Sequence, residues 1–465
     1  MDFVSLVNTV NSFVWGPYML VLLLGTGIFL TLRLGFMQIH TLPYALKLAF
    51  SKHQDETSEG DISHFQALMT ALAATIGTGN IAGVATAYVL GGPGAIFWMW
   101  VTAFFGMATK YAEAVLAIKY RTVDDNGEMA GGPMYFLEKG LPDHGLGKIL
   151  GVAFAFFGAF AAFGIGNMVQ TNSVADAVAS NFGVDPLITG FVLAIFTAAV
   201  ILGGIKSIGK ATGIIVPFMA VFYILAGLVI LAMNIGYIIP AFGTIFSSAF
   251  NFSAGFGALI GTAIMWGVKR GVFSNEAGLG SAPIAAAAAK TDHPGRQALV
   301  SMTGTFLDTI VVCTITGLVL TIAGLKAFPD LVGKTGAELT TAAFGSLLPY
   351  SHLMIGGNET SLGALLVTIG LIFFAYSTVL GWSYYGEKCF EYLIGTKGIR
   401  LYRIAFVLVA FWGATASLPL VWNIADTLNG AMAIPNLIGL LLLSGVVVSE
   451  TKAFNEIRKN EAKNA

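Results

Sequence analysis

Two glycine-rich polar segments interrupt otherwise apolar stretches of this chain, and their residue types suit the binding of a small zwitterion beside a cation. Residues 75–83 read TIGTGNIAG and residues 271–280 read GVFSNEAGLG. Each glycine destabilises a helix interior by about 1 kcal/mol relative to alanine. Inside a bilayer, unwound backbone is tolerated only where it lines a buried or water-filled cavity. We therefore expect two broken helices with exposed peptide dipoles, although the glycines could instead serve only close helix crossing.

The main-chain groups at such breaks have opposite signs. Free carbonyls at the end of the first half attract an ammonium or a bare cation, and free amides at the start of the second half attract a carboxylate. In the first segment, we expect free carbonyls from Ala74, Thr75 and Gly77, and free amides from Thr78, Gly79 and Asn80. In the second segment, Phe273 and Ser274 are expected to offer carbonyls near the ammonium, with Asn275 and Glu276 bordering the site.

Two further spans carry polar side chains in apolar surroundings. Asn167, Gln170 and Thr171 share one helical face because they are three and four residues apart. We expect Gln170 to donate its amide to a substrate carboxylate, but interhelical hydrogen bonding would equally explain this stripe. Ser377 and Thr378 offer hydroxyl oxygens that suit a hard cation such as sodium. Such hydroxyls can also bond to the preceding turn of their own helix.

Ionisable residues inside predicted spans are costly in a bilayer and are functional hypotheses by default. Glu276 is expected to neutralise Lys269 or Arg270 nearby in the sequence. Lys110 and Glu113, three residues apart, predict an internal ion pair. Asp308 and Asp426 are either pathway residues or structural. A phosphate loop, a CxxC motif and a catalytic serine pattern are absent from the sequence, which argues against an ATP-driven pump or an enzyme.

Composition indicates the elements that position these residues. Of the 465 residues, 56% are hydrophobic and 11% are charged, whereas a soluble chain carries about a quarter charged residues. The net charge of -1 gives no reason to expect nucleic acid. We expect an all-α polytopic protein of the lipid bilayer with eleven transmembrane helices. Their expected ranges are 16–34, 65–90, 95–118, 149–175, 186–204, 211–234, 255–289, 297–325, 361–386, 400–418 and 420–448.

Loop charges predict the orientation of the spans. If eleven spans alternate, one set of loops and the C-terminal tail carry nearly all loop lysines and arginines, and the other set carries only Lys326 and Lys334. The basic side is the cytoplasmic side, so the N-terminus is expected outside and the C-terminus inside the cell membrane. The two broken spans then run in opposite directions. This predicts a five-plus-five inverted repeat, the layout in which two broken helices mark a transporter's binding site.

The expected domain organisation follows from this repeat. Residues 1–64 would hold one extra N-terminal helix and a cytoplasmic interfacial segment, 65–234 the first five-helix unit, 255–448 the second, and 449–465 a cytoplasmic tail. A short extracellular helix is expected at 336–348. Cys313 and Cys389 are expected to be small buried residues rather than part of a disulfide framework.

The chain resembles the alanine or glycine:cation symporter family, also called sodium:alanine symporters, over nearly its whole length. The specific stretches are 73–84 (AATIGTGNIAGV), 131–135 (GGPMY) and 269–282 (KRGVFSNEAGLGSA). The family is similar to the wider amino-acid/sodium symporter superfamily with its inverted repeat. The resemblance implies that the break at 75–80 and Gln170 hold the substrate together with residues 273–276. It also implies that the Thr75 and Gly77 backbone hold sodium with Ser377 and Thr378, and we place Thr78 in both sets.

The predicted function is sodium-coupled import of alanine or glycine by alternating access, with sodium as the coupling ion and no cofactor. A proton-coupled amino-acid transporter, an ion channel and an amino-acid sensor without transport remain as alternatives. Reconstituted uptake under an imposed sodium gradient separates these classes.

Overall fold

The computed structural model describes residues 3–51, 58–250, 258–349, 352–355, 358–416 and 419–464. These residues are almost wholly helical, with two small antiparallel hairpins. Seven helices in the described ranges are long and apolar enough to cross a membrane, or eight if the bent pair His64–Thr75 and Gly79–Gly91 forms one span. The prediction of a helical, multi-pass membrane protein is therefore confirmed. The two hairpins are a departure from the all-α expectation.

Local sequence signals explain many helix ends in the first half of the chain. Ser63 and Gln66 form a reciprocal capping box at the start of the fourth helix, and Gly183 ends the ninth in the left-handed conformation. The elements are α1 (Phe3–Val14), α2 (Pro17–Arg33), α3 (Met37–Ala49), α4 (His64–Thr75), the π-helical η1 (Gly79–Gly83), α5 (Val84–Gly91), α6 (Gly94–Lys119), β1 (Thr122–Val123), β2 (Met129–Ala130), α7 (Pro133–Gly140), α8 (His144–Phe163), the π-helical η2 (Gly164–Met168), α9 (Val169–Phe182), α10 (Pro186–Ile201), α11 (Gly204–Met233), the 3-10 turn η3 (Ile235–Tyr237) and α12 (Ile238–Ala249).

The second half begins with the other interrupted helix. Its elements are α13 (Ala258–Asn275), α14 (Ala282–Ala287), α15 (Pro294–Thr305), the π-helical η4 (Phe306–Cys313), α16 (Thr314–Lys326), the 3-10 turn η5 (Phe328–Leu331), α17 (Gly336–Leu347), β3 (Leu353–Ile355), β4 (Asn358–Thr360), α18 (Leu362–Ile394), the 3-10 turn η6 (Thr396–Gly398), α19 (Ile399–Gly413), α20 (Pro419–Leu442) and α21 (Ser444–Asn464). Ser361 caps α18 through its side chain.

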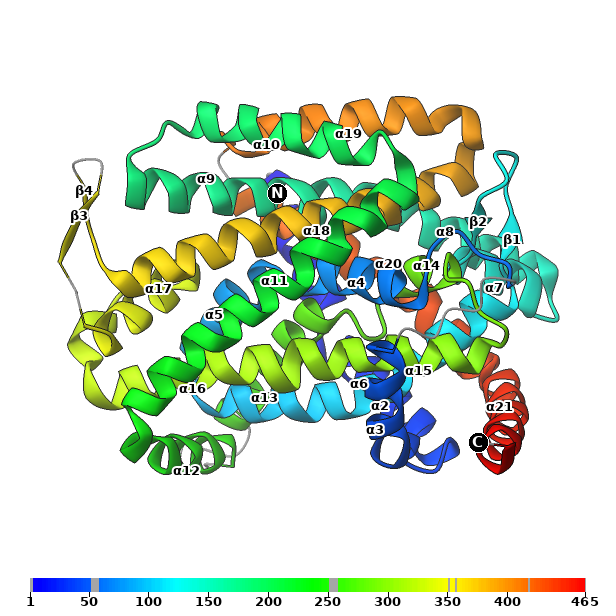
Figure 1. The fold of residues 1–465 in the computed structure, drawn as a ribbon, viewed down its shortest axis with the longest axis horizontal. Coiled ribbons are helices and arrows are strands. Elements are labelled where there is room, and N and C mark those ends of the chain that lie inside the picture. The colour runs from blue at the N-terminus through cyan, green and yellow to red at the C-terminus, as the bar shows by residue number, and fades with distance from the viewer. Residues whose placement is uncertain are drawn as a thin grey trace.

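Long helices lie roughly along the horizontal axis of Figure 1, with the β3–β4 hairpin at one end and the β1–β2 hairpin and α21 at the other. The segment His144–Phe182, formed by α8, η2 and α9, is one 39-residue helix, and Pro294–Lys326 is another of 33 residues. α10 and α19 lie side by side along one edge (Figure 1), α6 packs against α13 and α15, and α18 packs against α8 and α11. The interrupted helices therefore lie among long, continuous ones.

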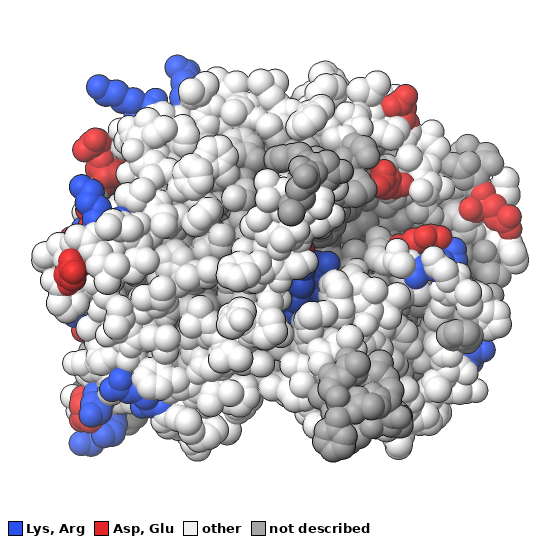
Figure 2. Space-filling model, turned by 180° about the vertical axis from the view of Figure 1, so that it is seen from behind, with Lys and Arg blue, Asp and Glu red and all other residues white. Residues whose placement is uncertain are grey.

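The face of the molecule seen in Figure 2 is mostly uncharged. Figure 2 shows Lys, Arg, Asp and Glu gathered towards the two ends of the body and inside a hollow, with a broad white surface elsewhere. Large apolar side chains such as Val21 on α2, Ile214 on α11 and Leu401 on α19 are exposed on this body. An exposed apolar surface of this extent fits contact with lipid rather than water.

Several elements differ from the sequence-based expectation. α1 and α12, of 12 residues each, are helices that the sequence analysis did not predict. The predicted final span 420–448 divides at Leu442, and α21 then continues through most of the expected tail. The short helix expected at 336–348 is present as α17. An interfacial segment was expected around 41–60: α3 provides its helix, and residues 52–57 lie outside the described ranges.

Candidate functional site

The first interruption lies where the sequence predicts it. α4 ends at Thr75, Ile76 is extended, and the chain resumes as the π-helical η1, with a bend of 49° between the two halves. Asn80 accepts the freed N–H of Gly77 on its side-chain oxygen at 2.9 Å. The break is thus stabilised from within by one of its own polar residues.

A small cavity lies against this break. Its volume is about 10 Å³, roughly the room that one water molecule requires. The lining residues are Ala74, Thr75, Gly77, Thr78, Gly79, Ile165, Gln170, Phe273, Glu276, Thr378 and Trp382. Most of the predicted substrate and cation residues therefore converge on one place, from α4, η1, α9, α13 and α18. The predicted residues that do not line it are Asn80, Ser274, Asn275 and Ser377, all of which are buried.

Gln170 links the break to α9. Its Oε1 accepts the Thr78 N–H at 3.4 Å, and its Nε2 donates to the Ile165 carbonyl at 2.9 Å. One amide hydrogen of Gln170 is thereby occupied, and the other remains for a ligand. The Thr78 hydroxyl is buried and has no hydrogen-bond partner among the described residues. A buried polar atom without a partner costs free energy, so this hydroxyl is a natural ligand contact.

The other members of the predicted polar stripe serve packing. Asn167 donates to the Phe406 carbonyl of α19 at 2.7 Å, and Thr171 bonds to carbonyls of its own helix. The interhelical interpretation therefore holds for Asn167, whereas Thr171 is satisfied within its own helix. Of the three residues, Gln170 alone lines the cavity.

Hydroxyl and carbonyl oxygens gather on the α18 side. Ser377 and Thr378 both direct their hydroxyls at the carbonyls of Ala73 and Phe374, at 2.9 to 3.4 Å. Thr75 instead bonds to Ala71 and Leu72 on its own helix. Within the described residues there is no cluster of three or more His, Cys, Asp or Glu side chains that could hold a metal. The oxygens present are the hard, neutral ligands that suit sodium rather than a transition metal.

The second interruption follows Asn275. Glu276, Gly278 and Gly280 all have positive φ angles of 58°, 91° and 84°. Positive φ is unusual for a residue other than glycine, and such outliers concentrate at functional sites. Glu276 accepts the Ser281 hydroxyl at 2.8 Å and lines the cavity. Among the described residues that line the cavity, Glu276 is the one carboxylate.

Two charged residues of α6 stabilise this break, and the predicted Lys110–Glu113 ion pair is wrong. Lys110 Nζ donates to the Asn275 carbonyl at 2.8 Å, where α13 ends. Glu113 Oε1 accepts the N–H groups of Gly278 and Gly280 at 3.0 and 3.1 Å. The cation therefore meets carbonyl groups and the anion meets amides, the arrangement that backbone dipoles favour.

The expected pairing of Glu276 with Lys269 or Arg270 is also wrong. Lys269 pairs with Asp426 at 3.3 Å. The Arg270 guanidinium lies over the rings of Trp266, Phe273 and Trp422. Sequence proximity suggested Glu276, but the α13 helix directs Lys269 and Arg270 away from the break.

A larger cavity of about 650 Å³ lies beside the small one and is lined in part by Arg270 and Trp422. Phe273, which lines the small cavity, stacks on Trp422 with ring centroids 5.9 Å apart. These two rings therefore separate the cavities. The sequence analysis did not anticipate Trp422, whose partner lies about 150 residues earlier.

Ile165 and Trp382 are cavity residues that the sequence analysis missed. Trp382 lies four residues after Thr378, on the same helical face, so the spacing could have indicated it. Gly166 allows this approach, because a Cβ there would collide with Trp382. Ile165 is brought to the cavity by the π-helical η2, which local sequence rules do not predict.

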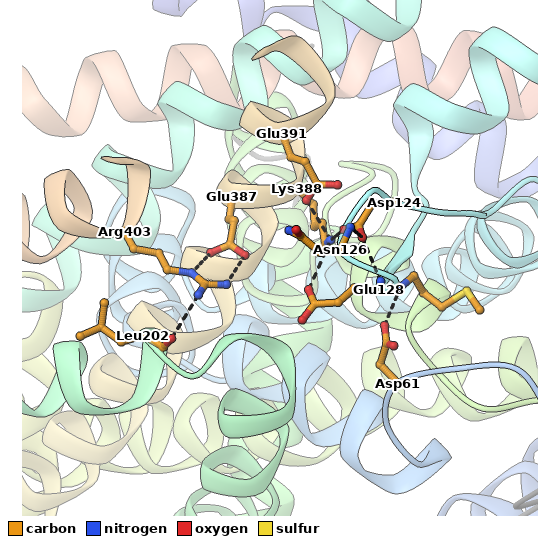
Figure 3. Close-up of polar contacts among 10 residues, drawn as sticks. Asp61, Asp124, Asn126, Glu128, Leu202, Glu387, Lys388, Glu391 and Arg403 are labelled. Atoms are coloured by element: carbon orange, nitrogen blue, oxygen red, sulfur yellow. Dashed lines mark hydrogen bonds and ion pairs between the residues drawn. The ribbon is translucent and has the colours of Figure 1, made fainter. Parts of the chain in front are cut away.

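The end of the molecule with the β1–β2 hairpin is held together by charged side chains (Figure 3). Lys388 of α18 lies 2.8 Å from Asp124 in the hairpin and 2.8 Å from Glu391. Arg403 of α19 donates two hydrogen bonds to the Glu387 carboxylate, at 2.6 and 2.7 Å. Burial raises the pKa of Asp124, but hydrogen bonds from Lys388 and the backbone outweigh it, so that the net pKa lies below its usual value.

Further hydrogen bonds to backbone carbonyls join elements at the same end of the molecule. Lys290 donates its N–H to the Ile62 carbonyl at 2.8 Å, which joins the start of α4 to the segment after α14. Arg121 adds hydrogen bonds to the carbonyls of Ala287 and Ala289 at 3.0 and 2.7 Å. The outer ends of both interrupted helices therefore meet each other at this face.

Comparison with known proteins agrees with these observations. The model of the sodium:alanine symporter family matches residues 1–465. The chain is 94% identical over 465 residues to a protein of Methanococcus maripaludis named sodium/alanine symporter AgcS, with the whole of both chains covered.

Two solved structures share the fold. MhsT in complex with L-phenylalanine matches with a TM-score of 0.58 at 15% identity, over 85% of this chain and 93% of that one. A sodium-coupled sialic acid symporter in a substrate-bound, outward-open state matches with a TM-score of 0.58 at 14% identity, over 92% of this chain and 86% of that one. On the evidence of the full-length family match and the 94% identical relative, the chain belongs to the sodium:alanine symporter family of membrane transporters.

Proposed function

We propose that the protein is a sodium-coupled symporter that imports alanine and glycine by alternating access. The observation that carries this proposal is the cavity shared by the first break, Gln170, Glu276 and Thr378 of α18. Its relative in Methanococcus maripaludis, named a sodium/alanine symporter, supports the choice of ion and substrate.

The substrate carboxylate would bind the free amide hydrogen of Gln170, the Thr78 hydroxyl and the amides at Thr78 and Gly79. The ammonium would face Glu276 across the cavity. Ile165, Phe273 and Trp382 provide apolar walls, which suit a methyl group or a hydrogen as the substrate side chain. The present volume is smaller than an amino acid, so the cavity must widen when substrate enters.

Sodium would bind where Ser377 and Thr378 meet the Ala73 carbonyl, with the backbone of Thr75 and Gly77 nearby. A cation at this point would order the first break, which also forms the carboxylate site. The two ligands would then stabilise the same local structure, and each would raise the affinity of the other. The membrane potential adds about 2.3 kcal/mol per charge per 100 mV to the driving force.

The proposed topology has eleven spans, with the N-terminus outside and the C-terminus in the cytoplasm. The spans are α2, α4 with α5, α6, α8 with α9, α10, α11, α13 with α14, α15 with α16, α18, α19 and α20. The first repeat would lie in 65–234 and the second in 255–448. The end of the molecule with the β1–β2 hairpin and the Lys388 cluster would then be the closed cytoplasmic face.

The decisive experiment is uptake of labelled alanine into proteoliposomes that contain the purified protein. We expect accumulation when sodium is high outside, and none when a proton gradient replaces the sodium gradient in sodium-free buffer. Uptake driven by protons alone would support a proton-coupled transporter. Binding without uptake would indicate a sensor, and rapid conductance that does not saturate would indicate a channel. In the same assay, a Thr378→Val variant should raise the sodium concentration needed for uptake.

A further inference from the structure

Asp308 is a membrane-embedded carboxylate with no role in the proposed site. It lies in the π-helical η4 between α15 and α16, is fully buried, and does not line the cavity. It forms no salt bridge with any side chain that the structure describes within 4 Å. A buried carboxylate inside a membrane protein is expensive unless donors satisfy it, so its contacts should show what it does.

Three donors converge on this carboxylate. Its Oδ1 accepts Asn80 Nδ2 at 2.7 Å and the Ser274 hydroxyl at 3.1 Å, and its Oδ2 accepts the Thr309 hydroxyl at 2.7 Å. Asn80 follows the first break and Ser274 precedes the second. One oxygen atom therefore connects the two interrupted helices.

The link to the first break continues through Asn80. Its amide nitrogen donates to Asp308, and its amide oxygen accepts the Gly77 N–H at 2.9 Å. The same amide nitrogen lies 3.3 Å from the Asp308 backbone carbonyl and 3.3 Å from Cys313 Sγ, so the carboxylate provides the shortest of its three contacts. The carboxylate therefore helps to hold the Asn80 amide in the orientation that satisfies the Gly77 N–H, and without it this restraint is weaker.

Asp308 is linked to the second break through Ser274. Ser274 approaches Gly79 so closely that a Cβ on the glycine would lie 3.1 Å from the Ser274 Cα. Phe273 and Glu276, on either side of Ser274 and Asn275, line the cavity. A displacement of Ser274 would therefore move the wall that faces the substrate.

A carboxylate at this position accepts all three donors at once, which an amide can do only if the Thr309 hydroxyl reverses its role and accepts. Both groups that meet Oδ1 are donors. Asparagine would keep the shape of the side chain but would turn an NH2 group towards at least one of these three donors. Charge-assisted hydrogen bonds are also about twice as strong as neutral ones.

We propose that Asp308 is a positioning residue that couples the two breaks, so that ordering of the first break by the cation also sets the substrate-facing wall of the second. This role rests on the proposed function. Asp308 contacts neither ligand and acts only through Asn80 and Ser274.

The test is the dependence of alanine affinity on sodium, measured by calorimetry on the purified full-length protein. In the wild type, saturating sodium should lower the alanine Kd. In Asp308→Asn, the alanine Kd at saturating sodium should rise about tenfold, and the ratio between the Kd values at low and high sodium should shrink towards one. Thr321→Val is the matched control. It removes a buried hydroxyl of the same long helix, whose hydrogen-bond partner among the described residues is the Gly317 carbonyl.

Ser274→Ala provides a second, milder variant in case Asp308→Asn does not fold. It should reduce the sodium ratio in the same direction, and in the double variant the two effects should be less than additive because they remove one shared hydrogen bond. A folded Asp308→Asn protein with the full wild-type ratio overturns the role of Asp308, as do strictly additive effects. Wild-type alanine binding that ignores sodium would instead overturn the proposed function itself.

Discussion

Thr378 donates its hydroxyl to the Ala73 carbonyl across 3.0 Å and so joins the middle of α18 to the last turn of α4 before the break. Ser377 directs its hydroxyl at the same carbonyl at 3.4 Å. Both hydroxyl oxygens are therefore hydrogen-bonded to the same carbonyl oxygen. In the proposed function, a sodium ion would replace these hydrogen bonds by coordinating the same oxygens.

Removing both hydroxyls should raise the sodium concentration needed for uptake. We expect Ser377→Ala combined with Thr378→Val to increase the half-saturating sodium concentration by about tenfold or more, because two of the oxygen ligands are lost. Titration of alanine uptake against sodium measures this. Ser383→Ala is the control, since that buried hydroxyl of α18 bonds, within the described ranges, to the Leu380 carbonyl of its own helix. An unaltered sodium dependence would eliminate this cation site.

Gly77→Ala should abolish sodium-dependent alanine binding. A Cβ at Gly77 would collide with Thr378 Oγ1, so either the Thr378 hydroxyl or the break itself would have to shift, and both belong to the proposed cation site. The control is Gly83→Ala in the same broken helix, where a Cβ meets nothing within 4 Å. Equilibrium binding of labelled alanine should be lost in the first variant and kept in the second. Equal binding by both would show that the close approach is not needed.

Gln170→Ala should weaken alanine binding by about tenfold while the fold is kept. The side chain supplies both the acceptor for the Thr78 N–H and a free amide hydrogen, and a lost hydrogen bond to a charged group costs about 1.5–3 kcal/mol. The measurement is the alanine Kd, with thermal unfolding as the check on folding. Ser173→Ala, nearly one turn further along α9, should behave as wild type. Unchanged affinity in a folded Gln170→Ala protein would refute this contact.

Glu113→Ala should reduce stability more than most single substitutions. The N–H groups of Gly278 and Gly280 would lose their buried acceptor, and each unsatisfied group costs about 1–3 kcal/mol. We expect a clear fall in the unfolding temperature in detergent. Glu456→Ala removes an exposed carboxylate of α21 and should have little effect. Equal unfolding temperatures for the two variants would contradict the stabilising role of Glu113.

Stability at low pH should depend on Asp124. Its pKa is lower in the folded protein than the ordinary value of 3.8, so the carboxylate contributes stability that is present above that value and lost as pH falls through the folded pKa. The unfolding temperature should therefore fall on acidification below about pH 4, and it should fall less in Asp124→Asn. Asp125→Asn, at the exposed neighbouring position, is the control and should keep the wild-type pH profile.

Several features were predictable from local sequence. The positions of both breaks follow from glycine and polar residues inside apolar stretches, because such residues are poor helix formers wherever they occur. Gln170, Ser377 and Thr378 stood out because polar side chains are rare in long apolar helices. The helices around 186–204, 297–325 and 361–386 followed from hydrophobic length alone.

The partners of these residues were decided by tertiary structure. Lys110 and Glu113 are three residues apart and suggested a local pair, but they contact a break about 165 residues away. Glu276 was assigned to its neighbours in sequence, whereas the helix carries Lys269 to Asp426 of α20. Sequence separation gives no measure of distance once helices pack, so such pairings appear only in three dimensions.

The sequence by itself therefore determined where the backbone unwinds and which side chains could bind an ion or an amino acid, because these depend on residue type and local spacing. The tertiary structure decided which of them share one cavity, how α6 stabilises the second break, and that Asp308 joins both breaks through Asn80 and Ser274. The physical reason is that helix propensity acts within a few residues, whereas hydrogen bonds form between whichever groups the packed helices bring together.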